Sequence, residues 1–311
     1  MILVMGATGN IGSKITTHLL AHGQKVRCVA RHFPNKEAFR GAELLQGDAN
    51  NVGFMTDAMR GCSVAFTMIP SNVKAPEMRF YQNKFGEVTA EAIEESGIKK
   101  IVNLSSVGAD LESGTGPILG LHDQEERLND IAGLDIMHLR PTYFMENLLA
   151  GIPTIVSMSR YFGTFPGDLE IPMIATRDIA ARAAFLLMNP TFKGHNVEHL
   201  LGERNICHDE VVRVLGEAIN WPNLEYVEVP PAEMKNYFVG AGLSEDWANG
   251  YNELAEAFTN GSMKASFQRD KTNTTATSIE EFARTTFQDA YSKALVGANK
   301  NRPQQQGEAR I

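Results

Sequence analysis

The feature that most constrains this chain is a glycine-rich turn directly behind an apolar start. Residues 1–5 are apolar, and Gly6, Gly9 and Gly12 follow at three-residue intervals, ahead of a helix expected over residues 11–21. In such a strand–turn–helix, the glycines allow the sharp turn, the approach of a pyrophosphate to the backbone, and close helix–strand packing. Free N–H groups at the helix start complete an anion site. The alternative is a tight turn without a ligand. The pattern predicts a dinucleotide site formed by Gly6, Thr8, Gly9, Asn10, Ile11 and Gly12.

The second strand, expected over residues 25–30, distinguishes between the two nicotinamide dinucleotides. An acidic residue at its end favours the ribose 2′-hydroxyl of NAD, whereas a basic residue favours the 2′-phosphate of NADP. No carboxylate ends this strand; Arg31 follows it, with Lys36 close behind. A guanidinium binds phosphate in bidentate fashion. We therefore expect NADP(H) rather than NAD(H); the competing interpretation of Arg31 is a solvated charge on a loop.

Length and composition exclude several classes of protein. The chain has 311 residues, of which 43% are hydrophobic and 21% charged, which suits one large globular domain with a smaller lobe. A net charge of −8 argues against nucleic-acid binding but not against protein partners. No apolar run suggests a membrane span or a signal peptide. The three cysteines lack metal-ligand spacing, so we expect no metal and a cytoplasmic location.

Strand-like and helical stretches alternate through the first half of the chain. Further strands are expected at residues 43–46, 64–68, 101–104 and 135–139. This alternation predicts a doubly wound α/β Rossmann fold with a parallel sheet, in which ligands bind beyond the carboxyl ends of the strands. That rule gathers the following residues at one rim: the glycine turn, Arg31, Asp48, Ile69, Pro70, Ser105, Ser106 and Tyr143.

The alternation breaks after residue 147. We expect a dinucleotide-binding domain over residues 1–150, to which residues 176–203 return through a helix capped near Thr176 and a strand at 197–200. Residues 151–175 and 204–290 are expected to form a smaller α/β lobe on the substrate side. The polar segment 298–311 is expected to be a disordered tail.

The chain resembles the NmrA-like family of atypical short-chain dehydrogenases/reductases. The resemblance covers the sequence up to about residue 287 and rests on the glycine motif, Gly47-Asp48, and the segments 102–106, 139–147, 176–180 and 278–282. It implies a cleft between a Rossmann domain and a smaller lobe, and an NADP(H) preference. Family members include quinone reductases, triphenylmethane-dye and azo-dye reductases, and regulators that bind the dinucleotide without turnover. The resemblance places Asp48 near the adenine, and Ile69 and Ser105 near the ribose and nicotinamide.

One family feature is replaced in this chain. A typical short-chain dehydrogenase carries Tyr-x-x-x-Lys on the helix after the fifth strand, so that both groups share one helix face. Here His122 and Glu126 occupy those places in a helix expected over residues 121–131. A histidine titrates near neutral pH and suits proton donation, and Glu126 is a candidate to hold its tautomer. The alternative is an ordinary surface pair. Tyr143 is a second candidate catalytic residue, with plain packing as its alternative.

These residues favour an NADPH-dependent reductase that transfers hydride to a quinone-like or electron-poor aromatic substrate. Such acceptors need orientation against the cofactor more than they need a strong acid. A flat substrate ring would suit apolar residues expected to face the cleft, namely Phe144, Met145, Tyr161, Phe162 and Phe165. The alternative is a non-catalytic NADP(H)-sensing regulator that acts through a protein partner. A nucleotide-sugar epimerase fits less well, because it would need the missing tyrosine. Monomers and homodimers both fit.

Overall fold

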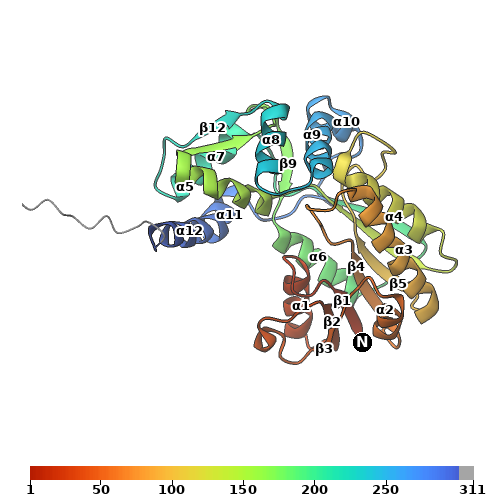
Figure 1. Ribbon diagram of the computed structural model, residues 1–311. Coiled ribbons are helices and arrows are strands. Elements are labelled where there is room, and N and C mark those ends of the chain that lie inside the picture. Colours follow the sequence, from red (N-terminus) through yellow and green to blue (C-terminus); the bar gives the residue numbers. More distant parts are fainter. Residues whose placement is uncertain (301–311) are drawn as a thin grey trace, which may run out of the picture.

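The computed structural model describes residues 1–300, and its largest element is a seven-stranded parallel sheet (Figure 1). The strand order is β3-β2-β1-β4-β5-β6-β10. The chain builds outward from β1 to β3 and then crosses back to start again at β4, which is the Rossmann arrangement expected from the sequence. The strands are β1 (Ile2–Met5), β2 (Val26–Ala30), β3 (Glu43–Gln46), β4 (Val64–Met68), β5 (Lys100–Leu104), β6 (Asp135–Pro141) and β10 (His195–Leu200).

Helices cover both faces of this sheet because its strands are apolar on both sides. Alternate residues of β1 enter separate cores: Ile2 and Val4 pack toward α1 (Gly12–Ala21) and α6 (Thr176–Met188). Leu3 and Met5 pack toward the opposite face. That face carries α2 (Val52–Met59), α3 (Met78–Ser96) and α4 (Leu119–Asn129). Two 3₁₀ turns, Lys36–Phe39 and Gly116–Ile118, lie in the connections.

Residues far along the chain return to the sheet. Strand β10 pairs in parallel with β6, and α6 packs against α1. The cap of α6 differs from the expectation, because Ala175 is its N-cap residue and no N-cap side chain binds the helix. Instead the Glu146 carboxylate accepts from the backbone N–H of Thr176 at 3.0 Å and from the Thr176 hydroxyl. The cap therefore comes from thirty residues earlier in the chain.

The rest of the described chain forms the smaller lobe, which lies above the sheet in Figure 1. It holds a three-stranded sheet, β11-β9-β7, and a pair, β12-β8. Its strands are β7 (Tyr143–Phe144), β8 (Arg160–Gly163), β9 (Ile171–Ile174), β11 (Asn205–Ile206) and β12 (Glu225–Glu228). Its helices are α5 (Ile152–Met158), α7 (His208–Ala218), α8 (Pro231–Gly240), α9 (Glu245–Thr259), α10 (Ser262–Ala265), α11 (Ile279–Phe282) and α12 (Gln288–Lys300). A 3₁₀ helix at Met145–Gly151 precedes α5, and a π-helical segment at Ala283–Phe287 precedes α12.

The C-terminal prediction is tested only in part. Helix α12 continues through residues 298–300, which the sequence assigned to a disordered tail. Residues 301–311 lie outside the described part of the chain. The exact limits of the two domains stay predictions.

Helix α9 fastens the lobe to the sheet domain. The Asp246 carboxylate accepts from the backbone N–H of Met78 at 2.7 Å, and the Ser244 N–H donates to the carbonyl of Val73 at 2.9 Å. Further along, a Cβ on Gly116 would stand 2.0 Å from the carbonyl oxygen of Gly250, so the two backbones meet only because Gly116 has no side chain. The loop after β4 is thereby held against the lobe.

A buried histidine in β6 makes the fold sensitive to acid. His138 is 1% exposed; its Nδ1 faces the amide nitrogen of Asn103 at 3.2 Å, and its Nε2 faces the Asn129 side-chain oxygen at 3.0 Å. This pattern fits a neutral ring that carries its proton on Nε2. Burial lowers the pKa of His138 to about 4, although the charge of Glu125 opposes the shift.

We expect the free energy of unfolding to fall as pH drops from about 6.5 toward 4. In that window the unfolded histidine binds a proton that the folded one excludes, which costs about 1.4 kcal/mol per pH unit at most. His138→Gln keeps a donor and an acceptor, so its stability should change less with pH across the same window. Denaturant unfolding at several pH values measures both slopes. Equal slopes for the two proteins would contradict this assignment.

Candidate functional site

The carboxyl ends of the parallel strands bring most of the expected site residues to one rim. Met5, Val29 and Leu45 are aligned across β1, β2 and β3, so the loops that follow them start side by side. On the other side of β1, Met68, Leu104 and Leu139 are aligned in the same way, which places the segments after β4, β5 and β6 together. The rim therefore divides into a glycine-turn half and a β4–β6 half.

The glycine turn has the backbone geometry that the sequence predicts. Gly6 has a φ of +65°, a conformation that side chains disfavour. A Cβ on Gly12 would stand 2.2 Å from the carbonyl oxygen of Gly6, so the start of α1 packs on the strand only with glycine there. Thr8, Gly9 and Asn10 are exposed, whereas the Ile11 side chain anchors the turn in the core. The turn thus presents open backbone at a helix N-terminus.

A lysine that the sequence analysis missed holds this turn. Lys14 Nζ donates to the Asn10 carbonyl at 2.8 Å and to the Thr176 hydroxyl oxygen at 3.1 Å. Burial lowers the pKa of Lys14, and the charge of Glu146 opposes the shift. The glycine turn is therefore linked through Lys14 to the start of α6. The four-residue spacing between Asn10 and Lys14 is the one sequence feature that indicated this contact.

The predicted 2′-phosphate residues lie on an anchored loop. Arg31 and Lys36 are exposed, and between them Phe33 packs edge-on against Phe39 with ring centroids 5.4 Å apart. Both rings are buried, so the loop is fixed while its basic side chains stay free to bind a ligand. The sequence did not predict that Tyr81 on α3 lies close to Arg31.

Tyr81 on α3 lies close to the loops that follow β2 and β3. Burial raises the pKa of Tyr81, the charge of Arg31 lowers it, and that of Asp48 raises it further. The two charged residues follow β2 and β3, so both lie near one hydroxyl. Asp48 is exposed, and its carboxylate accepts from the backbone N–H of Asn50 at 2.9 Å.

On the other half of the rim, Ile69 and Pro70 are half-buried but Ser105 is not open. Ser105 is 3% exposed and its hydroxyl donates to the Glu125 carboxylate, which also accepts from Arg140 at 2.6 and 3.0 Å. Burial would raise the pKa of Glu125, but the hydrogen bonds and charges of its partners hold it below the ordinary value. The side chain of Ser105 thus serves this network, and its backbone N–H donates to the Leu139 carbonyl at 2.8 Å.

His122 lies half-buried on α4 and is oriented by the backbone. Its Nδ1 lies 2.8 Å from the carbonyl oxygen of Ala109, in the loop after β5. A proton on Nδ1 leaves Nε2 as the acceptor nitrogen of the neutral ring. Glu126, the expected partner, is exposed and makes no hydrogen bond to His122 among the described residues. That expectation was wrong, because the Ala109 carbonyl occupies the orienting position instead.

Tyr143 lies where the rim meets the lobe, two residues after β6. It is half-buried, and its ring packs edge-on against Phe165 and His208 at centroid distances of 5.9 and 6.1 Å. Burial raises the pKa of Tyr143 well above its ordinary value, so the hydroxyl stays protonated. No interaction among the described residues joins Tyr143 to His122. The structure thus places the two candidate catalytic residues on separate elements.

The apolar residues expected to face a cleft differ in their exposure to solvent. Phe144 and Phe162 are half-buried, whereas Met145, Tyr161 and Phe165 are at most 5% exposed and belong to the core of the lobe. For these three the expectation of a cleft-facing surface was wrong. Their side chains pack in the hydrophobic core of the lobe.

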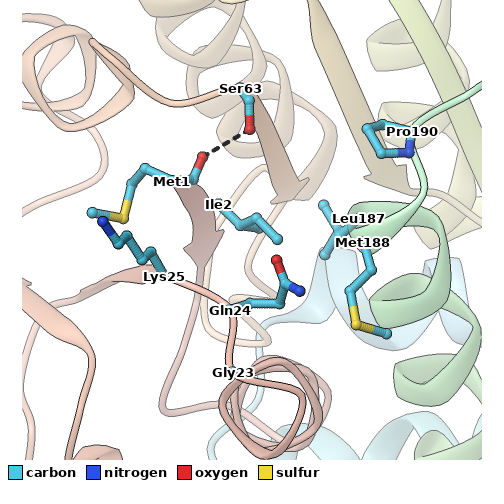
Figure 2. A pocket seen from close by; sticks show the side chains of 9 residues that line it. All are labelled: Met1, Ile2, Gly23, Gln24, Lys25, Ser63, Leu187, Met188 and Pro190. Carbon is cyan, nitrogen blue, oxygen red and sulfur yellow. Dashed lines mark hydrogen bonds between the residues drawn. The ribbon is translucent and has the colours of Figure 1, made fainter.

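A hollow of about 320 Å³ lies at the opposite end of the sheet (Figure 2). It is lined by residues at the amino end of β1 and the connection before β2, including Met1, Ile2, Gln24 and Lys25. Ligands of parallel sheets bind beyond the carboxyl ends, so this hollow does not belong to the site. Within residues 1–300, no cluster of histidine, cysteine or carboxylate side chains is arranged to hold a metal. No helix in that range is long and apolar enough to cross a membrane.

The parallel sheet, the open glycine turn and the basic loop define a Rossmann protein with a dinucleotide site. The chain belongs to the NmrA-like family, whose sequence model matches residues 1–283. This confirms the resemblance seen in the sequence.

Individual relatives agree with this assignment. An NAD(P)H azoreductase of Xenophilus azovorans is 26% identical over 258 residues, which cover 82% of this chain and 86% of that protein. The fold matches that of an Escherichia coli NADPH-dependent quinone oxidoreductase bound to NADPH, with a TM-score of 0.78, 22% identity and coverage of 92% and 100% of the two chains. It also matches a Citrobacter triphenylmethane reductase in complex with NADP(H), with a TM-score of 0.74, 18% identity and coverage of 95% and 100%.

Gly12→Ala should weaken both the fold and dinucleotide binding. The added Cβ meets the Gly6 backbone, and relieving that overlap costs about 1–3 kcal/mol and moves the turn. Thermal melting with and without NADPH measures both effects. Gly53→Ala in α2 is the matched control, since the nearest atom to its Cβ stands 3.6 Å away. Similar melting and binding in the two variants would show that the turn does not depend on Gly12.

Proposed function

We propose that this protein is an NAD(P)H-dependent reductase that transfers hydride to a flat, electron-poor aromatic acceptor such as a quinone. The observation that carries the proposal is the open glycine turn on a rim that leads, through Tyr143, into an aromatic lobe. The azo-dye, quinone and triphenylmethane-dye reductases among its relatives support the same reaction class.

The chemistry needs few groups from the protein. NADPH delivers two electrons as a hydride, the quinone takes them with one proton, and the products are NADP⁺ and the hydroquinone. Because the acceptor is intrinsically reactive, holding its ring against the nicotinamide supplies most of the acceleration. For this reason, hydride transfer does not require a tyrosine and a lysine at the positions that His122 and Glu126 occupy.

We assign the proton to His122. The carbonyl of Ala109 holds its Nδ1, so Nε2 of the imidazolium is the donor for the developing oxyanion. Tyr143, with its protonated hydroxyl at the junction with the lobe, is proposed to orient the acceptor rather than to ionise.

We further propose that the cofactor is NADP(H), with the adenine lying against Asp48. Arg31 and Lys36 stand exposed on a loop fixed by two buried phenylalanines, and no carboxylate is present at the end of β2 to accept from a 2′-hydroxyl. Ile69, Pro70 and Ser105 are then the candidates for contact with the ribose and nicotinamide.

Arg31→Ala should weaken NADPH binding by roughly tenfold to a hundredfold, the value of one lost charge-assisted phosphate contact. NADH binding should change little, because NADH lacks the phosphate. Equilibrium titration gives the ratio of the Kd of the variant to that of the unchanged protein, for NADPH and for NADH. Arg60→Ala, which removes an exposed arginine paired with Asp57, is the control. Equal weakening of NADPH and NADH by Arg31→Ala would overturn the assignment.

The purified protein should oxidise NADPH in the presence of at least one member of a panel of quinones, azo dyes and triphenylmethane dyes. Tight NADPH binding without turnover on every acceptor would contradict the reductase and favour a dinucleotide-sensing regulator.

His122→Ala should lower kcat with a good quinone by roughly tenfold to a hundredfold, since the proposed proton donor is gone. Steady-state kinetics at saturating NADPH measure this. His22→Ala, in an exposed residue after α1, should leave kcat unchanged. An unaltered kcat in His122→Ala would remove His122 from the mechanism.

A further inference from the structure

The carbonyl that orients His122 lies in the loop after β5, and packing alone does not fix its direction. Ala109 is 1% exposed, and its side chain packs in the core of the lobe. Apolar packing is non-directional, so it fixes where the residue lies but not where its carbonyl points. The Ala109 carbonyl and the Asp110 nitrogen belong to one planar peptide unit. A contact that holds Asp110 therefore also restricts the direction of this carbonyl.

That contact comes from Arg140 on β6. One nitrogen of its guanidinium donates to the Asp110 carboxylate at 3.2 Å, and two others donate to the Glu125 carboxylate at 2.6 and 3.0 Å. Glu125 lies on α4, about one helical turn after His122. Arg140 thus connects the loop that carries the Ala109 carbonyl with the helix that carries His122. We call Asp110, Arg140 and Glu125 the arginine bridge.

The arginine bridge has a buried end and a partly exposed end. The side chain of Glu125 is 4% exposed and that of Arg140 is 12% exposed, whereas that of Asp110 is 37% exposed. A planar guanidinium presents its N–H groups in a rigid fork, so it holds two carboxylates in one fixed geometry. Removing the Asp110 carboxylate therefore cuts the link to the loop and leaves the buried pair intact.

The other polar contacts of the loop set its path but not the direction of the carbonyl. The N–H of Ala109 donates to Ser106 at 3.2 Å, and that of Leu111 donates to Gly108 at 3.1 Å. Gly108 takes a φ of +85°, which a tight turn requires. Neither bond uses the Ala109 carbonyl, which is left to accept from Nδ1 of His122 at 2.8 Å.

We propose that Arg140 and Asp110 are positioning residues that act on His122 through the Ala109 carbonyl. When Nε2 of the imidazolium gives its proton to the acceptor oxyanion, the ring left behind is the neutral Nδ1–H tautomer, which this carbonyl stabilises. The kinetic part of the inference rests on the proposed reductase function. The tautomer is a property of the protein alone and does not depend on turnover.

Asp110→Ala tests the tautomer directly. We expect the neutral His122 ring of the unchanged protein to be mainly Nδ1–H, and that of Asp110→Ala to be a mixture of both tautomers. Asp110→Asn keeps an oxygen that accepts from Arg140, so it should restore the Nδ1–H form. ¹⁵N NMR of ring-labelled histidine at mildly alkaline pH measures this, and His122→Ala identifies the signals. An unchanged tautomer ratio in Asp110→Ala would overturn the proposal.

Kinetics give a second readout that a merely structural role would not move. With a good quinone, Asp110→Ala should lower kcat by up to about fivefold, since the ion pair is partly exposed, and leave the KM for NADPH unchanged. In protein that already carries His122→Ala, the same substitution should have no further effect. Glu112→Ala is the matched control, because it removes an exposed carboxylate further along the same loop. Additive losses in the double variant would contradict the proposal.

The two readouts separate the positioning role from the proposed function. If the tautomer responds as expected but no acceptor is reduced, the reductase function fails and the positioning of His122 stands. If kcat falls while the tautomer ratio stays unchanged, the positioning fails and the reductase function stands.

Discussion

The close approach of two backbone segments, at Gly6 and Gly12, is the constraint on which the rest of the site depends. Because a Cβ on Gly12 would overlap the Gly6 carbonyl, α1 starts directly against β1 and points its free N–H groups across the rim. Lys14, one turn into α1, then bonds to Thr176, whose helix is capped by Glu146 at the base of the lobe. The anion site, the sheet and the lobe are thereby connected through a short chain of polar contacts.

The same geometry explains how a chain without the usual tyrosine and lysine fits a reductase. The loop after β4 is held by α9, and the Tyr143 ring packs edge-on against Phe165 where the rim meets the lobe. On the β4–β6 half of the rim, the Glu125 carboxylate accepts hydrogen bonds from Ser105 and Arg140. These side chains therefore stabilise the fold and are not open to a ligand. We therefore propose that acceleration comes mainly from orientation of a reactive acceptor, with His122 as the proton donor.

The sequence predicted the sheet domain well, because mostly apolar strands alternate there with helices bounded by clear signals such as Gly97, which ends α3 with a φ of +73°. It predicted the glycine turn for the same reason: its requirements are local. It did not predict β7, β9 or β11, which are too short for periodicity to appear, nor the cap of α6 by Glu146. The sequence also placed Phe165 at a cleft, although it is buried in the core of the lobe. Contacts of this kind depend on the tertiary fold and leave no spacing pattern.

The central claim is that the dinucleotide on the rim and the acceptor in the lobe meet face to face. The most direct measurement is the transfer of deuterium from NADPH labelled separately on each face of the nicotinamide, during reduction of an uncharged quinone in the absence of oxygen. We expect the label to be lost, with a primary isotope effect, from one face only. Retention of the label on both faces, or equal loss from both, would contradict a single fixed geometry for hydride transfer.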